Sequence, residues 1–293
     1  MNHYYCPNEE CKQHTNPDDN FYIKKGSFIT KYNHQPVPRY QCKTCSTKFS
    51  SHTFRDTFLQ KKPYLNQQVF ELYASCTTLN RLAKVLRCDR KTVVRKFLFL
   101  GAKAKRIHED RIAKGELKTS YVQFDEMETY EVSKLQPLSI SIAVRPKTGE
   151  IIDVAVASMK SKGLLADLAF LKGIVREDTR NEAREQVMAT VAKCAKDRIT
   201  VACDAHTTYP SIVKAAMPQA EIKTIPNSKR DHDGTFDLLF GINHLCAVLR
   251  HDLSRLRRKS WVTTKKASRL YWHLYLYIAY RNKYSIAMFS LRQ

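Results

Sequence analysis

The sequence predicts an α/β protein in which a mixed β-sheet flanked by helices follows two small modules. Three observations support this prediction: strand-like and helix-like patterns alternate after residue 119, a helical apolar period occupies residues 65–98, and four cysteines form two close pairs before residue 60. The 293 residues, 43% of them hydrophobic, suffice for one medium core and small modules. We therefore expect three parts, residues 1–60, 61–118 and 119–293.

The charge of the chain is strongly positive and unevenly distributed. The formal net charge is +22, and the isoelectric point is near 9.6. Residues 61–120 carry 15 basic and 5 acidic side chains and residues 236–293 carry 11 and 2, whereas residues 121–235 carry 16 of each. This distribution favours a polyanionic partner, and we expect double-stranded DNA. A membrane surface is the alternative. However, no apolar run reaches about 18 residues and the N-terminus is polar, so we expect a soluble, cytoplasmic protein.

Four of the nine cysteines have the spacing of a metal site. Cys6 and Cys11 are separated by four residues, and Cys42 and Cys45 by two. Two tight turns of this kind supply four thiolates tetrahedrally to one Zn²⁺, so we predict a structural zinc ribbon in residues 1–60. Disulfides are the alternative, but a chain without an export signal is expected in a reducing compartment. So small a module buries little apolar surface, and zinc must supply much of its folding free energy.

Residues 78–98 have the pattern of a helix-turn-helix. Two short apolar-periodic segments are joined by a three-residue turn, and Thr78 and Asp89 can cap their N-termini. Six basic residues of this segment are available to a major groove and its phosphates: Arg81, Lys84, Arg90, Lys91, Arg95 and Lys96. A helical hairpin with a solvated basic face is the alternative. Residues 103–118 have the pattern of a basic, mostly helical linker.

Acidic residues lie within or directly after two segments whose sequence patterns otherwise predict buried strands. The run 121–130 is strand-like but contains three acids, of which Asp125 is the first, and no Lys or Arg lies within six residues of it. Burying a carboxylate is costly unless another group neutralises it. Residues 199–203 form a second apolar run, and Asp204 follows directly after it. Two such carboxylates would provide hard oxygen ligands for Mg²⁺ or Mn²⁺.

The order of the predicted elements indicates how these acids meet. Strands are expected at 121–130, 138–144, 150–157, 199–203 and 221–225, with helices at 164–175, 176–198, 209–217 and from 236 onward. Three strands, helix, strand, helix, strand, helix is the order of a ribonuclease-H-like core. In that fold the first and fourth strands are adjacent at the centre of the sheet, so Asp125 and Asp204 would come together.

Two stretches resemble a known family, the small bacterial insertion-sequence transposases of the Asp-Asp-Glu class, especially the insertion-sequence-one type and its zinc-ribbon relatives. Asp125-Glu-Met-Glu128 is similar to the family's first-acid motif. The segment from Ile242 to Arg250 is similar to its last helix, in which the third catalytic residue is followed seven positions later by a base. The chain departs from the family at that third position, where the usual Glu is Asn243.

This resemblance implies a DNA transposase that binds insertion-sequence ends and catalyses metal-dependent phosphodiester cleavage and strand transfer. The implied catalytic residues are Asp125, Asp204, Asn243 and Arg250, and the first three would hold Mg²⁺ or Mn²⁺. An amide oxygen is a legitimate ligand for these ions, but one negative charge fewer predicts weaker metal affinity. Synapsis of two ends implies a homo-oligomer on DNA in the bacterial cytoplasm.

Other interpretations stay open at this point. Asn243 could be an ordinary surface residue of its helix, and Asp233 or Asp237 could be the third ligand instead. Two other functions are also compatible with the sequence: a catalytically inactive, transposase-derived DNA-binding regulator, which the Asn at position 243 favours, and a nuclease with the same core.

Overall fold

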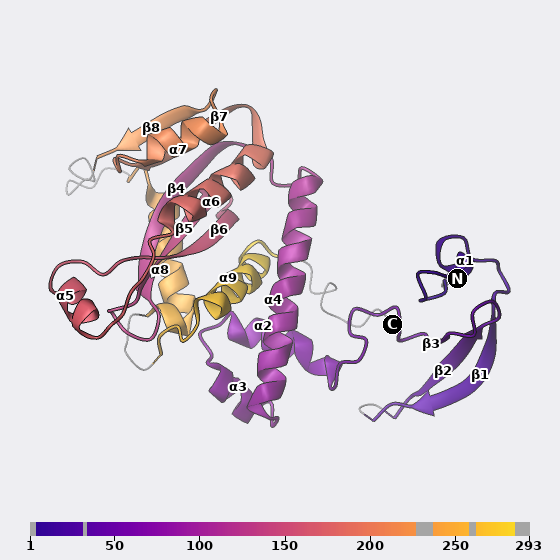
Figure 1. Cartoon of the computed structure of the whole chain (residues 1–293). Coiled ribbons are helices and arrows are strands. Elements are labelled where there is room, and N and C mark those ends of the chain that lie inside the picture. The colour runs from indigo at the N-terminus through magenta and orange to yellow at the C-terminus, as the bar shows by residue number, and fades with distance from the viewer. Residues whose placement is uncertain (1–3, 32–33, 227–236, 258–261, 285–293) are drawn as a thin grey trace. The chain divides into compact units, whose positions relative to one another are not determined.

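The computed structural model describes residues 4–31, 34–226, 237–257 and 262–284 (Figure 1). Its internal contacts divide the chain into two units, with the boundary between Leu65 and Asn66. The first unit corresponds to the predicted zinc module. The helical segment and the sheet, predicted as separate parts on either side of residue 118, belong to one unit.

The first unit is a small antiparallel sheet with a cluster of aromatic and cysteine side chains. Its elements are α1 (Lys12–Thr15), β1 (Tyr22–Ile29), β2 (Pro36–Cys42), β3 (Lys48–Ser50) and the 3₁₀ turn η1 (Pro63–Leu65). The strands are ordered β1-β2-β3, and both pairs are antiparallel. Phe21, Tyr40 and Phe49 pack with Cys6, Cys11 and Cys42, so the cysteines and the aromatic residues form one core.

The second unit begins with helices α2 (Asn66–Tyr73), α3 (Leu79–Val85) and α4 (Arg90–Ala113). The Thr78 hydroxyl accepts a hydrogen bond from the Arg81 backbone N–H at 3.3 Å, and the Asp89 carboxylate accepts one from that of Lys91 at 2.6 Å. Both predicted N-caps are therefore confirmed.

Helix α4 is longer than the sequence pattern suggested, because it continues through most of the region predicted as a linker. That region is rich in Ala, Lys, Arg and Ile, and no proline interrupts it. At Gly101 a Cβ atom would lie 2.9 Å from the carbonyl oxygen of Trp272 on α9 (Ala267–Arg281), so glycine allows the two helices to approach closely. No helix in the described part of the chain is both long and apolar enough to span a bilayer.

A mixed five-stranded sheet forms the centre of the second unit. Its strands are β4 (Thr119–Tyr130), β5 (Pro137–Arg145), β6 (Glu150–Ser158), β7 (Ala195–Asp204) and β8 (Glu221–Ile225). Their order is β6-β5-β4-β7-β8. The pairs β4–β5 and β5–β6 are antiparallel, whereas β4–β7 and β7–β8 are parallel. This confirms the predicted α/β class and places the first and fourth strands side by side.

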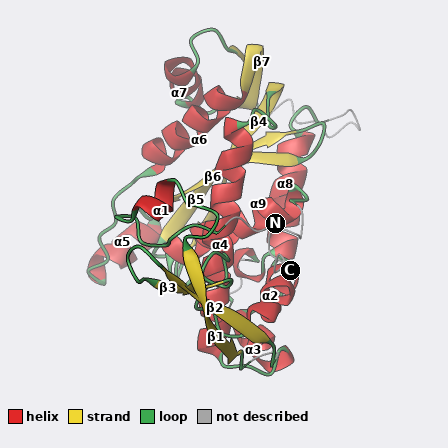
Figure 2. Cartoon of the chain, turned by 90° about the vertical axis from the view of Figure 1, so that its right-hand side faces the viewer, coloured by secondary structure: helices red, strands yellow, loops and turns green. Residues whose placement is uncertain are grey.

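Helices cover both faces of this sheet (Figures 1 and 2). After β6 the described helical elements are α5 (Leu164–Leu171), α6 (Arg180–Cys194), α7 (Tyr209–Ala216), α8 (Phe240–Asp252), the 3₁₀ turn η3 (Ser254–Leu256) and α9. Val187 and Val191 of α6 belong to the main core together with Val122 and Phe124 of β4 and residues of α7, and α6 packs mainly on β5 and β6. Helix α8 packs against β4 and β5 on the other face, and α9 packs against the edge strand β6. Most residues of β5 are buried.

Candidate active site

Two carboxylates occupy adjacent positions on neighbouring parallel strands. In the β4–β7 ladder Phe124 pairs with Cys203, and the next residues along the two strands are Asp125 and Asp204. Side chains at equivalent positions of parallel neighbours point to the same face of a sheet, and neighbouring strands lie about 4.8 Å apart. Both acids are half-buried. The structure therefore brings together two predicted site residues that are far apart in the sequence.

The start of α8 is fixed to β4 two residues before Asp125. The side-chain oxygen of Gln123 accepts a hydrogen bond from the Ile242 N–H at 2.9 Å, and its amide nitrogen donates to the Leu238 carbonyl at 2.7 Å. A Cβ atom at Gly241 would lie 2.7 Å from both the Gln123 oxygen and the Pro146 ring. Gln123 and Asp125 point to the same face of β4, so α8 lies over the face that carries the two acids.

Asn243, Cys246 and Arg250 share one face of α8, because they are spaced by three and four residues. Burial, together with the negative charge of Asp125, raises the pKa of the Cys246 thiol to about 12, although the positive charge of Arg250 opposes this shift. Asp125 and Arg250 therefore both lie near Cys246. The face of α8 that carries the predicted Asn243 and Arg250 is turned toward the first acid.

The orientation of the Asn243 amide is set by a second acid. Its Nδ2 atom donates to the Asp237 carboxylate at 2.6 Å, and the other oxygen of Asp237 accepts from the Leu239 N–H at 2.9 Å. A carboxylate only accepts, so nitrogen must face Asp237 and the amide oxygen points elsewhere. The alternative third ligand Asp237 is thus a direct neighbour of Asn243. Asp233 lies outside the described residues.

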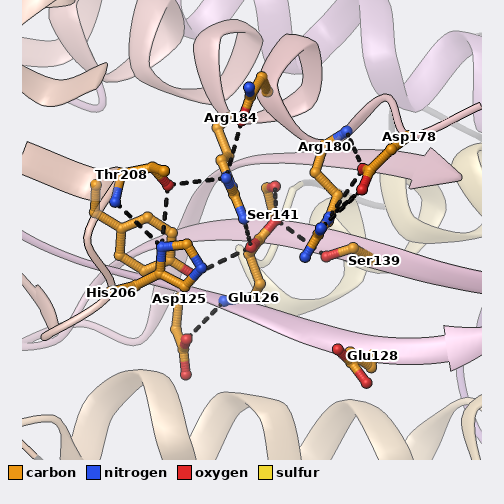
Figure 3. A network of polar contacts seen from close by, with 12 residues as sticks. Asp125, Glu126, Glu128, Ser139, Ser141, Asp178, Arg180, Arg184, His206 and Thr208 are labelled. Carbon is orange, nitrogen blue, oxygen red and sulfur yellow. Dashed lines mark hydrogen bonds and ion pairs between the residues drawn. The ribbon is translucent and has the colours of Figure 1, made fainter. Parts of the chain in front are cut away.

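Glu126 lies on the opposite side of β4 and is part of a buried polar network (Figure 3). Its carboxylate accepts hydrogen bonds from Arg184 at 2.6 Å, from Ser139 and Ser141 at 3.0 and 3.1 Å, and from Tyr209 at 3.2 Å. The exposed fraction of the side chain is 3% for Arg184 and 10% for Glu126. The next acid of this strand, Glu128, is exposed and pairs with Lys162 at 3.2 Å.

The network stabilises the ionised form of Glu126. Burial by itself raises the pKa of this carboxyl, but the hydrogen bonds and charge of Arg184, together with the two serine hydroxyls, outweigh it and hold the pKa below its ordinary value. Burial and the nearby negative charges raise the pKa of Tyr209, which keeps its phenol protonated as a donor to Glu126.

Arg184 also connects the two strands that carry the acids. Its second guanidinium nitrogen donates to the Thr208 hydroxyl at 2.9 Å, and that hydroxyl lies 3.0 Å from the Nδ1 atom of His206. The His206 backbone N–H donates to the Asp204 carboxylate at 3.1 Å, and the Glu126 N–H donates to the Asp125 carboxylate at 2.7 Å. The network therefore positions the backbone beside both acids.

Sequence reasoning did not find Arg184, although a signal for it exists. Arg184 lies three residues before Val187 and seven before Val191, on the apolar stripe of α6. A basic residue in a buried helical stripe requires a buried acidic partner. That pattern could have indicated an ion pair with one of the acids of residues 121–130.

We expect Arg184→Ala to destabilise the protein by roughly 3–5 kcal/mol, because it leaves the Glu126 carboxylate buried without its cation. Urea unfolding at neutral pH measures the loss. Lys162→Ala is the matched control. It breaks an ion pair whose side chains are 68% and 56% exposed, so its effect should be within about 1 kcal/mol. Equal losses for the two variants would contradict a structural role for the buried pair.

Five of the six predicted DNA-facing side chains lie at the surface of α3 and α4: Arg81, Lys84, Arg90, Lys91 and Arg95 are exposed. Lys96 differs from the prediction. It is 4% exposed, its ammonium group donates to the Asn66 side chain of α2 at 2.9 Å, and burial lowers its pKa to about 8. Lys96 therefore contributes to the packing of α4 against α2 and does not belong to the exposed basic surface.

The four predicted cysteine ligands form one cluster in the first unit. Their sulfur atoms all lie within 4.8 Å of one another, with Cys6 and Cys45 at 3.4 Å and Cys11 and Cys42 at 3.9 Å. Four sulfurs about 2.3 Å from a central Zn²⁺ would be about 3.8 Å apart, so the cluster fits a tetrahedral zinc site. All four are free thiols, which does not support the disulfide alternative.

No protein-family model and no curated protein sequence matches this chain. The geometry of the acids, the four-cysteine cluster and the exposed basic helices is therefore the basis for assigning a function.

Proposed function

We propose that the chain is a DNA transposase that binds insertion-sequence ends and catalyses metal-dependent cleavage and strand transfer. The observation that carries the proposal is the adjacency of Asp125 and Asp204 on parallel strands, beneath the helix that presents Asn243. The strand order β6-β5-β4-β7-β8, with two antiparallel pairs followed by two parallel pairs, supports a ribonuclease-H-like core.

In this proposal Asp125, Asp204 and the Asn243 amide oxygen hold the cations. These are hard oxygen donors of the kind that Mg²⁺ and Mn²⁺ prefer. Two bound ions supply activation of the attacking hydroxyl and stabilisation of the leaving oxygen during in-line displacement at phosphorus. Arg250 lies one helical turn beyond Cys246 and contacts a phosphate oxygen of the DNA. Asp237 holds the Asn243 amide so that its oxygen, and not its nitrogen, is presented.

The positive charge of the helical segment supports DNA as the substrate. In the proposal α3, α4 and the turn between them act as a helix-turn-helix. The exposed basic side chains of α4 lie in the major groove and contact the flanking phosphates. The four-cysteine unit binds structural zinc and contributes to recognition of the ends.

Exposed apolar side chains on α5 and the residues after it support self-association on DNA. Leu164, Phe170 and Leu171 are 87%, 83% and 79% exposed, and Val175 is 93% exposed. Several large apolar side chains exposed in one short segment are typical of an interaction site, and synapsis of two ends requires at least two subunits.

The proposal is tested by incubating the protein with Mg²⁺ or Mn²⁺ and duplexes taken from the DNA on either side of its coding sequence, together with a plasmid target. Specific 3′ nicking and joining of the nicked strand to the plasmid are expected. Cleavage without joining would indicate a nuclease. End binding without cleavage would indicate an inactive regulator, an alternative that the Asn at position 243 favours.

Lys91→Ala combined with Arg95→Ala should weaken duplex binding roughly 10- to 100-fold at moderate salt, because two exposed basic side chains that contact phosphates in the proposal are lost. A gel-shift titration measures the change. Lys162→Ala serves as the control, because it removes an exposed basic side chain that is far from this helix in the sequence. If the double variant binds duplex as tightly as the control does, the DNA-binding role of α4 is wrong.

A further inference from the structure

A strongly basic cleft lies between the start of α4 and the segment that leads into α9. Its volume is about 520 Å³. Three separate stretches of the chain line it: residues 73–94 from the helical segment, residues 254–255 in η3, and residues 262–269 before and within α9. The lining therefore joins the helices assigned to DNA with a part of the sequence more than 150 residues away.

The lining contains five cations and, among the described residues, no acidic side chain. The cations are Arg90, Arg255, Lys265, Lys266 and Arg269. The polar groups beside them include the hydroxyls of Thr78, Ser254 and Thr263. The positive charges of the cleft repel one another, and a bound anion would offset this electrostatic repulsion.

Tyr73 lines the cleft, and the charges of three of the cations act on its phenol. Burial raises the pKa of the Tyr73 phenol, and the positive charges of Arg255, Arg269 and Arg90 oppose that shift. The Arg255 guanidinium donates to the Tyr73 hydroxyl and lies 5.9 Å from the centre of its ring. Arg90 is held by a hydrogen bond of 2.6 Å from its Nε atom to the Asn80 side chain. Two of these guanidinium groups are thus already oriented by neighbours.

Arg269 provides an independent sign of a missing partner. Its Nη1 atom is buried and has no hydrogen-bond partner among the residues that the structure describes. Buried guanidinium donors are normally satisfied, because an unsatisfied one has lost its water without replacement. Arg269 as a whole is only half-buried and lines the cleft, so an oxyanion bound there would accept from its guanidinium group.

We propose that this cleft binds a backbone phosphate of duplex DNA, and that residues 254–255 and 262–269 thereby complete the DNA-binding surface of α3 and α4. All the charged side chains that line the cleft are cationic donors. A planar guanidinium group can donate two parallel hydrogen bonds to two oxygens of one phosphate. The inference rests on the proposed function only in taking DNA as the partner. It assigns a binding role to Arg255, Lys265, Lys266 and Arg269, which the helix-turn-helix pattern does not include.

The test is the salt dependence of binding to a random-sequence duplex of about 30 base pairs, measured without divalent cation. Each phosphate contact contributes about 0.9 to the slope of log K against log salt concentration. Arg269→Gln should lower the magnitude of that slope by about 1 and weaken binding roughly five- to tenfold at 0.1 M salt. Arg269→Lys should restore most of the slope. Lys265→Ala combined with Lys266→Ala should lower it by about 2, and both lysines are exposed, so folding is not at risk.

Lys172→Ala is the matched control, since it removes one exposed positive charge from the α5 terminus, outside the cleft. Its slope should equal that of the wild type. Unchanged slopes for the Arg269 and the double-lysine variants would overturn the proposal while leaving the transposase assignment intact. Absence of duplex binding by the wild type would instead remove the shared premise that DNA is the partner.

A second arm distinguishes DNA from free phosphate. Titration with inorganic phosphate, followed by calorimetry, should show at most weak binding to the wild type. Tight binding that Arg269→Gln abolishes, with the DNA slope unchanged, would assign the cleft to a free phosphate and overturn the DNA assignment.

Discussion

Asp125→Ala or Asp204→Ala should abolish strand cleavage, with a loss of at least about 1,000-fold, while duplex binding stays within about twofold of the wild type. The two carboxylates are adjacent on β4 and β7, and in the proposed mechanism each supplies oxygen ligands to the cations. Metal-ion catalysis contributes several kcal/mol of transition-state stabilisation, and each 1.36 kcal/mol corresponds to a tenfold change in rate. Nicking and strand-transfer rates at saturating Mg²⁺, with a gel shift on the same preparations, measure the two effects.

Substitutions on α8 identify the third ligand. Asn243→Ala removes the amide oxygen, so activity should fall at low Mg²⁺ and recover partly at high Mg²⁺ or with Mn²⁺. Asp237→Ala should have a smaller effect of the same kind if its role is to orient Asn243. The reverse order of the two effects would make Asp237 the ligand. Full activity of Asp125→Ala at low Mg²⁺ would contradict the assignment of the whole metal site.

Cys42→Ser should remove bound zinc and unfold the first unit, while the second unit keeps its melting transition. Structural zinc sites supply apparent binding free energies of about 10–16 kcal/mol in small modules, and the unit has few other buried apolar side chains. Metal analysis and the loss of dispersed amide signals from residues 4–65 measure the outcome.

Cys88→Ser is the control for this prediction, because Cys88 is a free thiol of the second unit and lies outside the cluster. It should retain one zinc per chain. A full equivalent of zinc in Cys42→Ser, or none in the wild type, would contradict the assignment of the four cysteines.

Local patterns in the sequence determined the elements and several of their details. Thr78 and Asp89 are N-caps because a short polar side chain before a helical period can only reach the first free N–H groups of that helix. The two cysteine pairs were recognisable because close spacing itself builds the turns that a metal site needs. The alternation of strands and helices predicted the class of the fold. The order of those elements also predicted, by analogy with a known fold, that Asp125 and Asp204 would be neighbours.

Only the tertiary structure decided which polar side chains face inward and what they contact. A lysine on a basic helix looks the same in sequence whether it meets solvent or a neighbouring helix, so Lys96 was assigned to DNA although it binds Asn66. The partner of Glu126 is 58 residues away, and the orientation of Asn243 depends on the carboxylate of Asp237. The basic cleft joins residues that are more than 150 positions apart. Such contacts depend on how helices pack, and packing depends on the three-dimensional fit of many side chains, which local patterns do not specify.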